Sequence, residues 1–393
     1  MKKFSANYVY PVNSDPVKNG VITVDENGQV VDISQFDDQH PERASMAYYN
    51  GVLVPGFINA HCHLELSHLK GKFQQKTGIA GFISQVKDQR TASADEIEIS
   101  IKRALSTLFT QGVVAVGDIC NTTDTIELKY SSKIRFHNFI EIFGLNSDHA
   151  KQILIKGFEI KDQFEKTYEG FNTLAPHATY SLSEKLWNLL SHEFINQNDP
   201  ISIHYGESKE EYEFLEKRSG KLANSFIHDG IRIDLPAIAG PLEIVSNYIP
   251  AENKILFVHN TYVSQKETEL IFGKFRDPYF VLCPSSNLFI EGVLPDVPML
   301  FNSGVPIALG TDSYASTYTI SVFDQIMILL EEFPSLRFED VSKWGTLNGA
   351  KALNFEGELG SFEVGKKPGI NLITNFDFRK MRPTSRSQIK KIL

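Results

Sequence analysis

The sequence predicts an α/β protein in which a TIM-type (β/α)8 barrel carries a small β-sandwich domain formed from both chain ends. Eight short apolar runs alternate with longer amphipathic segments, which is the pattern of βα units that build a parallel sheet. Strand-like segments with glycine-containing turns lie before and after this region. A chain of 393 residues has the length for one such barrel and an attached domain. We expect residues 1–55 and 356–393 to form the small domain and residues 56–355 to form the barrel.

The first segment of the chain has the pattern of short strands: "YVYPV", "GVITVDENGQVVDI" with a turn at residues 26–28, and "AYYNGVLVPG". The last segment, "GELGSFEVGKKPGINLITNFDF", returns to strand character and is expected to complete the sheet begun by the amino terminus. The eight barrel strands are expected at residues 56–63, 113–119, 134–142, 171–178, 201–208, 255–262, 279–287 and 306–312.

Helices are expected between these strands. The segment "ADEIEISIKRALSTLFTQG" keeps its apolar residues on one face and ends at Gly112. The segment "SEKLWNLLSHEFINQN" behaves alike, with Ser183 as its N-cap. Further helices are expected in "YTISVFDQIMILLEEF" and "EDVSKWGTLNGAKAL".

Composition excludes several functional classes. Hydrophobic residues make up 42% of the chain and charged residues 22%, which is typical of a globular protein. The net charge of -9 argues against a surface that binds nucleic-acid phosphates. No apolar stretch reaches the ~18 residues of a membrane span, and no secretory signal is evident. The three cysteines lack paired spacing, so we expect a reducing, cytoplasmic environment.

Polar residues at the carboxyl ends of barrel strands are the candidates for chemistry, because active sites of such barrels lie there. His61 and His63 end the first expected strand and would share a face if that strand is regular, whereas Cys62 would face packing. The other strand ends carry His177, His204, His259 and Asp312. The remaining histidines are expected to be exposed or satisfied by structural contacts; these are His40, His68, His137, His149, His192 and His228.

Three imidazoles and one carboxylate suit one divalent metal ion, so His61, His63, His204 and Asp312 are the predicted ligands. Zinc is the first choice, and iron or manganese would also suit this ligand set. A metal with an open position would acidify a bound water and make hydroxide available as a nucleophile. Structural zinc sites, by contrast, are usually closed and cysteine-rich.

The quoted strand ends resemble the motifs of the amidohydrolase superfamily. "PGFINAHCH" resembles its first-strand signature, "IHYGES" its fifth-strand histidine, "VHN" its sixth strand and "LGTD" its eighth, while "GELGSFEVGKKPGINLI" resembles its closing strands. The four motifs are specific as a set, and the resemblance covers nearly the whole chain. Two-metal members carry a carbamylated lysine at the end of strand four. This chain has "LAPHATY" there, with His177 and no lysine, which favours a one-metal site.

The resemblance also implies roles for single residues. Glu207, three residues after His204, matches the aminohydrolases, in which this acid protonates a ring nitrogen while hydroxide attacks the adjacent carbon. Its alternative is an exposed glutamate that opens the acidic helix "ESKEEYEFLEK". Asp312 would accept the proton of water, and His259 would orient the hydroxide. His177 would contact substrate, or would make a hydrogen bond behind the ligands.

The extension "HLELSHLKGK", followed by "TGIAGFISQV" and Arg90, resembles the same region of aminodeoxyfutalosine deaminases. The position of His177 resembles that of a substrate-contacting histidine in deaminases of adenosylhomocysteine and methylthioadenosine. The candidate substrate contacts are therefore Glu65, Arg90 and Ser286. The alternative for Glu65 and Arg90 is that they are ordinary surface residues. The alternative for Ser286 is that it is simply a polar loop residue. In adenosylhomocysteine-type deaminases a ribose-binding glutamate falls about where Arg90 lies here. This chain departs from that pattern, because it has an arginine where those deaminases have the ribose-binding glutamate.

The leading prediction is a mononuclear metal-dependent hydrolase that deaminates a purine nucleoside-like or related amino-heterocycle. A hydrolase of amide, cyclic amide or chloro compounds is a second reading, and a catalytically idle binding protein on the same fold is a third. The expected partner is a small molecule, with neither nucleic acid nor membrane, and a homodimer is the default oligomeric state.

Overall fold

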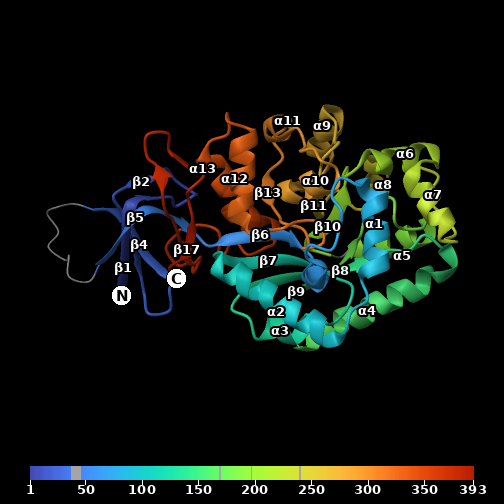
Figure 1. Cartoon of the computed structure of the whole chain (residues 1–393), viewed down its shortest axis with the longest axis horizontal. Coiled ribbons are helices and arrows are strands. Elements are labelled where there is room, and N and C mark those ends of the chain that lie inside the picture. The colour runs from blue at the N-terminus through green and yellow to red at the C-terminus, as the bar shows by residue number, and fades with distance from the viewer. Residues whose placement is uncertain (37–45, 168–169, 196, 239) are drawn as a thin grey trace.

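The computed structural model has the predicted fold class and describes residues 1–36, 46–167, 170–195, 197–238 and 240–393 (Figure 1). A strand occurs at each of the eight predicted barrel positions. These strands form two parallel four-stranded sheets, in the orders β6-β7-β8-β9 and β10-β11-β12-β13. Their bounds are β6 (Phe57–Cys62), β7 (Val113–Cys120), β8 (Arg135–Ile142), β9 (Phe171–Pro176), β10 (Ile201–Tyr205), β11 (Lys254–His259), β12 (Asp277–Leu282) and β13 (Ile307–Leu309).

The two sheets meet along both seams through a few backbone hydrogen bonds. On one side the N–H of His204 donates to the carbonyl of His177 at 2.9 Å. On the other side the N–H groups of Thr311 and Asp312 donate to the carbonyl of His61 at 2.9 and 3.0 Å. Both seams are therefore closed by residues at the carboxyl ends of the strands, where an active site is expected.

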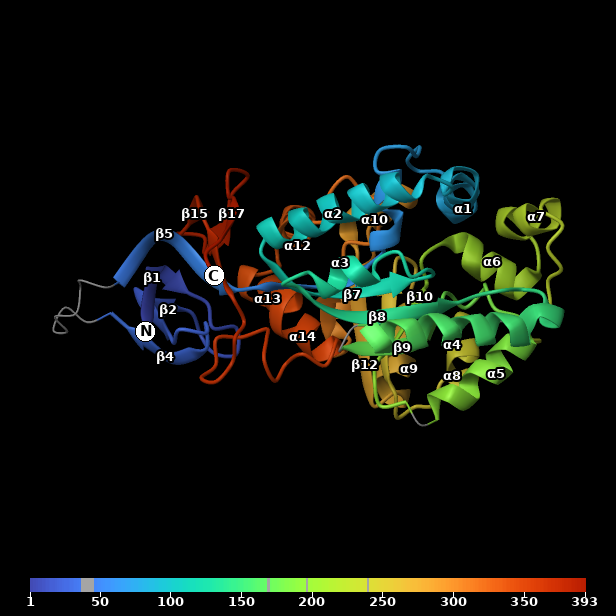
Figure 2. The same cartoon turned by 90° about the horizontal axis from the view of Figure 1, so that it is seen from below.

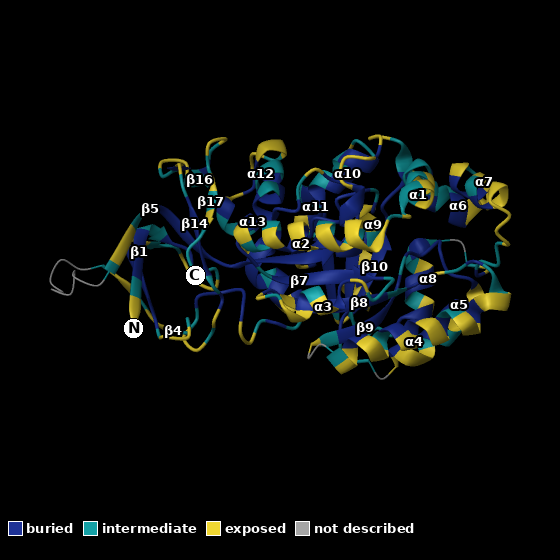
Figure 3. Ribbon diagram, turned by 60° about the horizontal axis from the view of Figure 1, so that its bottom comes forward, coloured by how far each residue is buried: buried dark blue, intermediate teal, exposed yellow. Residues whose placement is uncertain are grey.

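Helices surround the eight strands, and their outer faces carry the exposed residues (Figure 3). The helical segments are η1 (Leu64–Leu69), α1 (Gly78–Gln89), α2 (Ala94–Thr110), α3 (Ile126–Tyr130), η2 (Ser147–His149), α4 (Ala150–Thr167), α5 (Glu184–Phe194), α6 (Lys209–Lys217), α7 (Lys221–His228), α8 (Pro241–Tyr248), α9 (Gln265–Lys274), α10 (Pro284–Ile290), α11 (Val297–Asn302), α12 (Val322–Glu332), α13 (Phe338–Lys343), η3 (Trp344–Asn348) and α14 (Gly349–Ala352). None of these described helices is long and apolar enough to cross a membrane.

Local sequence signals explain the helix ends. Ser183 caps α5 as predicted, because its hydroxyl accepts a hydrogen bond from the N–H of Leu186. After α2 the chain reverses at Gly112, whose φ of +77° favours glycine. Strand β7 follows directly and is buried along almost its whole length, because helices cover it on one side and other barrel strands on the other.

The terminal segments form one mixed sheet of seven strands beside the barrel, and both chain ends lie in it (Figures 1 and 2). The order is β17-β14-β5-β1-β3-β4, with β2 paired to β1. The strands are β1 (Lys2–Val9), β2 (Val17–Lys18), β3 (Gly20–Val24), β4 (Val30–Gln35), β5 (Met46–Pro55), β14 (Ile370–Ile373) and β17 (Ile389–Lys391); a separate pair comprises β15 (Phe376–Asp377) and β16 (Arg382–Pro383). The predicted pairing of the two ends is confirmed, and the domain boundaries at residues 55 and 356 stay a prediction.

Candidate active site

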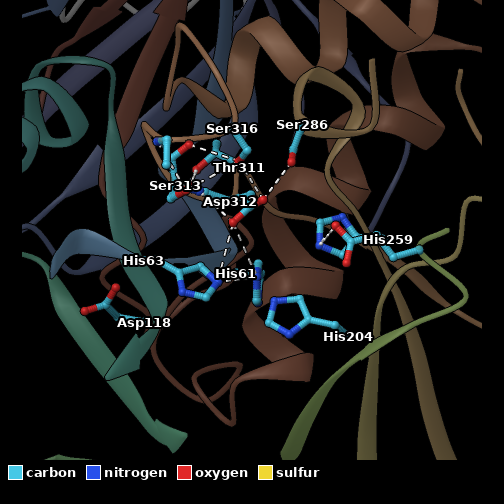
Figure 4. A network of polar contacts seen from close by, with 12 residues as sticks. His61, His63, Asp118, His204, His259, Ser286, Thr311, Asp312, Ser313 and Ser316 are labelled. Atoms are coloured by element: carbon cyan, nitrogen blue, oxygen red, sulfur yellow. Dashed lines mark hydrogen bonds and ion pairs between the residues drawn. The ribbon is translucent and has the colours of Figure 1, made fainter. Parts of the chain in front are cut away.

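Five of the predicted side chains gather at the carboxyl ends of the barrel strands (Figure 4). His61 lies in β6, His63 directly follows this strand, His204 lies in β10, His259 ends β11 and Asp312 follows β13. The ring centroid of His61 is 4.9 Å from those of His63 and His204 and 5.9 Å from that of His259. All five side chains are buried, so the fold removes them from bulk water and holds them together.

The spacing of these atoms fits one divalent cation. The Nε2 atoms of His61 and His63 are 3.1 Å apart and lie 3.9 and 3.5 Å from Oδ1 of Asp312. Ligands at about 2.1 Å from a tetrahedral zinc ion would be about 3.4 Å from each other. His61 also groups with His204 and His259, and the donor atoms of that set lie within 4.8 Å of one another. The donors are thus spaced as ligands that converge on a shared centre.

The backbone at this end of the barrel is strained. His259, Asn260 and Asp312 have positive φ angles of 77°, 56° and 60°. Such conformations cost about 1–3 kcal/mol each and cluster at functional sites. A side chain on Gly310 would place its Cβ 2.8 Å from the Cβ of His61, so only glycine lets the chain pass this close to the histidine before it turns at Asp312.

Strand β6 ends irregularly, which the sequence pattern did not predict. Its register with β7 shifts between Asn59 and Cys62. Cys62 is buried in the hydrophobic core, as expected, and burial raises the pKa of its thiol. The histidines therefore meet through a bulged strand end and the turn that follows it, and not through simple alternation.

The Asp312 carboxylate is fixed by three hydrogen bonds. The hydroxyls of Ser286 and Ser316 each donate to Oδ2 at 2.6 Å, and the N–H of Ser313 donates to Oδ1 at 2.7 Å. Burial raises the pKa of Asp312, but the neighbouring His63 and His259 and the two serine hydroxyls outweigh it and lower the pKa to about 2. Asp312 is therefore a carboxylate at neutral pH.

The imidazoles are kept neutral. Burial and then the neighbouring rings of His204 and His63 lower the pKa of His61 well below its ordinary value. Burial and then His177 and His259 do the same to the pKa of His204. The Nδ1–H of His204 donates to the carbonyl of His177 at 2.7 Å, which leaves its Nε2 as the electron-pair donor. Neutral imidazole is the form that binds a metal.

Glu207 and His259 lie together beside this cluster. Oε1 of Glu207 is 3.5 Å from Nε2 of His259, and neither ring nitrogen of His259 has a hydrogen-bond partner within the described part of the chain. The backbone N–H of Glu207 donates to Glu211 at 3.0 Å. Burial, then the charges of Asp312 and Glu211, raise the pKa of Glu207 well above its ordinary value. Glu207 is a buried acid, and its alternative as an exposed residue at a helix start is wrong.

The candidate substrate contacts have protein partners. Glu65 is buried, and its Oε1 accepts a hydrogen bond from Arg90 at 2.7 Å while its Oε2 accepts from the N–H of Asn121 at 2.9 Å. The Arg90 side chain is 38% exposed. Ser286 directs its hydroxyl at Asp312. His177 places its ring centroid 4.8 Å from that of His204, and its Nδ1 lies 3.0 Å from Oγ of Ser181. Substrate contacts by these four residues stay predictions.

Two acids at the ends of β7 and β8 were missed. Asp118 forms a fully buried ion pair with Lys129 at 2.5 Å, and its Oδ1 accepts from the N–H of Leu64, next to His63, at 2.8 Å. Glu141 lies beside His177 and His204 in a third group of donors. The strand-end rule that selected the histidines applies equally to strands two and three, and it would have found both acids.

The histidines outside the cluster behave as expected where they are described. His68 bonds to the carbonyl of Arg90 at 2.9 Å, and His137 lies 3.1 Å from the hydroxyl of Thr173. The exposed ones are His149, His192 and His228, whereas His40 lies outside the described residues.

A (β/α)8 barrel with neutral histidines and a carboxylate converging at the carboxyl ends of its strands defines a metal-binding barrel of the hydrolase class. The chain belongs to the amidohydrolase family, whose model matches residues 52–387. The resemblance stated from the motifs is thereby confirmed.

Known deaminases are similar to this chain over most of its length. An adenosine deaminase of Helicobacter pylori is 26% identical over 360 residues, covering 90% of this chain and 86% of its own. The solved structure of H. pylori aminofutalosine deaminase in complex with methylthio-coformycin has a TM-score of 0.82 at 23% identity and covers 95% of this chain and 92% of its own. An adenosine deaminase from Xanthomonas campestris with bound zinc has a TM-score of 0.73 at 20% identity, with 98% and 87% covered.

Proposed function

We propose that this chain is a mononuclear metal-dependent hydrolase that deaminates a purine nucleoside-like or related amino-heterocycle and releases ammonia. The observation that carries the proposal is the pairing of a buried acid, Glu207, with the carboxylate of Asp312 at one histidine cluster. A proton donor and a proton acceptor with pKa values moved apart are what deamination needs. The names of the similar proteins support the same class of reaction, and aminodeoxyfutalosine-like compounds belong among the candidate substrates.

His61, His63, His204 and Asp312 would hold the cation, with zinc as the first choice because a related structure contains it. When bound, the cation supplies Lewis-acid activation of the attacking water. The residues of the chain then move the protons. Asp312 takes one proton from water and later gives it to the leaving amine. The hydrogen bonds from Ser286 and Ser316 to Oδ2 fix the orientation of this carboxylate, so that Oδ1 lies nearer His61 and His63.

Glu207 completes the proton balance. Its carboxyl protonates the ring nitrogen while the oxygen of water bonds to the adjacent carbon, so the negative charge that would develop on the ring is neutralised. When the carbon–nitrogen bond breaks and ammonia leaves, the hydroxyl proton of the tetrahedral adduct returns to Glu207. His259, whose ring nitrogens accept or donate no hydrogen bond among the described residues, orients the oxygen as it adds. The product keeps one proton on its ring nitrogen.

Ammonia release tests this proposal directly. The zinc-loaded chain is incubated with adenosine-, aminodeoxyfutalosine-, guanine- and pterin-like compounds, and free ammonia is measured. We expect release from one class of compound and a loss of kcat by about 10²–10⁴ in Glu207→Gln, because an amide cannot donate the acid proton. Glu216→Gln, an exposed position on helix α6, which follows Glu207 in the chain, is the matched control and should keep full activity.

Other outcomes assign the site differently. Zinc-loaded protein that releases no ammonia from any compound contradicts deamination and favours hydrolysis of an amide, a cyclic amide or a chloro compound. A chain that fails to bind zinc at all would favour an idle binding protein. A homodimer and a cytoplasmic location stay predictions.

The rate should depend on pH through Glu207. The acid form is the active one, so activity is present below the pKa of this carboxyl and is lost as pH rises through it. Burial raises that pKa well above its ordinary value, and the rate should therefore hold through the weakly acidic range and fall only at higher pH. The measurement is kcat against pH with zinc occupancy checked at each point. A residual rate in Glu207→Gln that still shows this alkaline fall would contradict the assignment.

A further inference from the structure

Glu141 is a buried carboxylate beside the candidate active site. It is the penultimate residue of β8, and its side chain is 6% exposed. Side chains alternate in direction along β8, so Asn138 and Glu141 lie on opposite faces of the strand. Asn138 accepts a hydrogen bond from Lys129 on the helix side, whereas Glu141 lies beside His177 and His204. Glu141 therefore belongs to the barrel mouth.

One oxygen of Glu141 has a protein partner and the other has none among the described residues. Oε2 accepts a hydrogen bond from the side-chain amide of Asn121 at 2.9 Å. Oε1 is buried and unpartnered. Leaving a buried acceptor unsatisfied is unfavourable, so such an atom beside a catalytic cluster points to a ligand that satisfies it.

The ring of His204 does not serve Oε1 as a donor. Nδ1 of His204 lies 3.9 Å away, which is beyond hydrogen-bonding distance, and its proton is donated to the carbonyl of His177 at 2.7 Å. The carbonyl of His177 therefore orients the ring of His204, and Glu141 does not. The same bond argues against a second cation held by Glu141, His177 and His204, because the protonated Nδ1 of His204 has no electron pair to offer and its Nε2 is assigned to the first cation.

The surroundings of Oε1 suit an organic substrate. Phe143, two residues further along, is 46% exposed, and its ring centroid lies 5.9 Å from that of His177. The imidazole of His177 thus lies beside Glu141, and the apolar ring of Phe143 lies next to that imidazole. A group that fits there carries a hydrogen-bond donor, because Oε1 is a buried acceptor without one.

We propose that Oε1 of Glu141 accepts a hydrogen bond from an O–H or N–H group of the substrate outside the reacting ring, which makes Glu141 a specificity-determining residue. This inference rests on the proposed deamination. It adds the end of strand three to the substrate contacts predicted from the sequence, which are His177, Glu65, Arg90 and Ser286.

Three matched compounds test it: adenosine, 2′,3′,5′-trideoxyadenosine, which lacks all three sugar hydroxyls, and 3′-amino-3′-deoxyadenosine, which replaces one hydroxyl by an amine. KM, kcat and the dissociation constant from titration calorimetry are measured for zinc-loaded wild type, Glu141→Gln and the exposed control Glu193→Gln. We expect Glu141→Gln to raise KM about 10- to 100-fold for the compound or compounds whose donor Glu141 recognises. The KM of the trideoxy compound should stay within about threefold, and kcat should be nearly unchanged. The adenosine and amino arms distinguish a hydroxyl from an amine donor.

Several results would overturn the inference. Equal losses on all three compounds would make Glu141 a structural residue, and two zinc ions per wild-type chain that fall to one in Glu141→Gln would make it a ligand. If wild type binds these compounds but releases no ammonia, the proposed deamination is wrong, and the role of Glu141 is tested by the dissociation constants alone. Tighter binding of the hydroxylated or aminated compound that disappears in Glu141→Gln supports the role of Glu141. Wild type that binds none of the three, or all three equally, contradicts it.

Discussion

Replacement of Asp312 by Asn should lower kcat by about 10³–10⁴-fold, because the amide cannot take the proton of the attacking water and gives the cation no charge. Asparagine suits this position better than alanine, since Asp312 has a φ of 60° that asparagine tolerates. The substitution thus changes the chemistry while the backbone turn is kept. The measurement is steady-state ammonia release together with zinc content per chain.

The control for this experiment is Asp234→Asn. Asp234 also accepts hydrogen bonds from a backbone N–H and an arginine, but it lies away from the histidine cluster, and its variant should keep full activity. Ser316→Ala, which removes one hydrogen bond to Oδ2 of Asp312, should cost a smaller factor than Asp312→Asn. An Asp312→Asn enzyme that binds zinc and works within tenfold of wild type would refute the assigned role of Asp312.

Lys129→Met should lower the free energy of unfolding by about 3–5 kcal/mol, since it leaves the Asp118 carboxylate buried without its counter-ion. Both side chains are fully buried, and Nζ of Lys129 also donates to Asn138 at 2.6 Å. Burial alone would lower the pKa of Lys129, but Asp118 and Cys120 outweigh it and raise that pKa. Lys129 is therefore a cation at neutral pH, and Asp118 is its ion-pair partner. Urea unfolding of the metal-free chain measures the effect without a contribution from zinc binding.

The double variant Lys129→Met, Asp118→Asn separates charge burial from packing. Asparagine can still accept the hydrogen bond from the N–H of Leu64, so the turn after His63 is kept. We expect the double variant to be more stable than the sum of the two single losses predicts. Lys102→Met breaks an exposed ion pair with Glu98 and should change stability by less than about 0.5 kcal/mol. Strictly additive losses at positions 118 and 129 would contradict the buried-pair interpretation.

The sequence by itself determined the class of fold, the number and order of the barrel strands, and the histidines and aspartate of the candidate site. These follow from local signals: apolar runs, helical periodicity, and polar residues at positions where each strand ends. His61, His204, His259 and Asp312 could be selected one strand at a time, because the carboxyl ends of parallel strands meet at one end of a barrel whatever the details of packing.

The tertiary structure decided which polar residues are already used by the protein and which remain free. The sequence offers Glu65, Arg90 and Ser286 as substrate contacts. In the structure Arg90 donates a hydrogen bond to Glu65, and the hydroxyl of Ser286 donates one to Asp312. Such pairings join residues 25 or more positions apart, so no local pattern records them. The strand-end pattern selects Glu141 as well, but only the folded structure leaves its Oε1 without a donor among the described residues.

Burial settles the remaining chemistry. The same side chain is exposed at Glu216 and buried at Glu207, and burial with the neighbouring charges raises the pKa of Glu207. The sequence supplies the ionisable groups and their order along the strands. Desolvation and neighbouring charges, which exist only after folding, assign their protonation states and with them their roles.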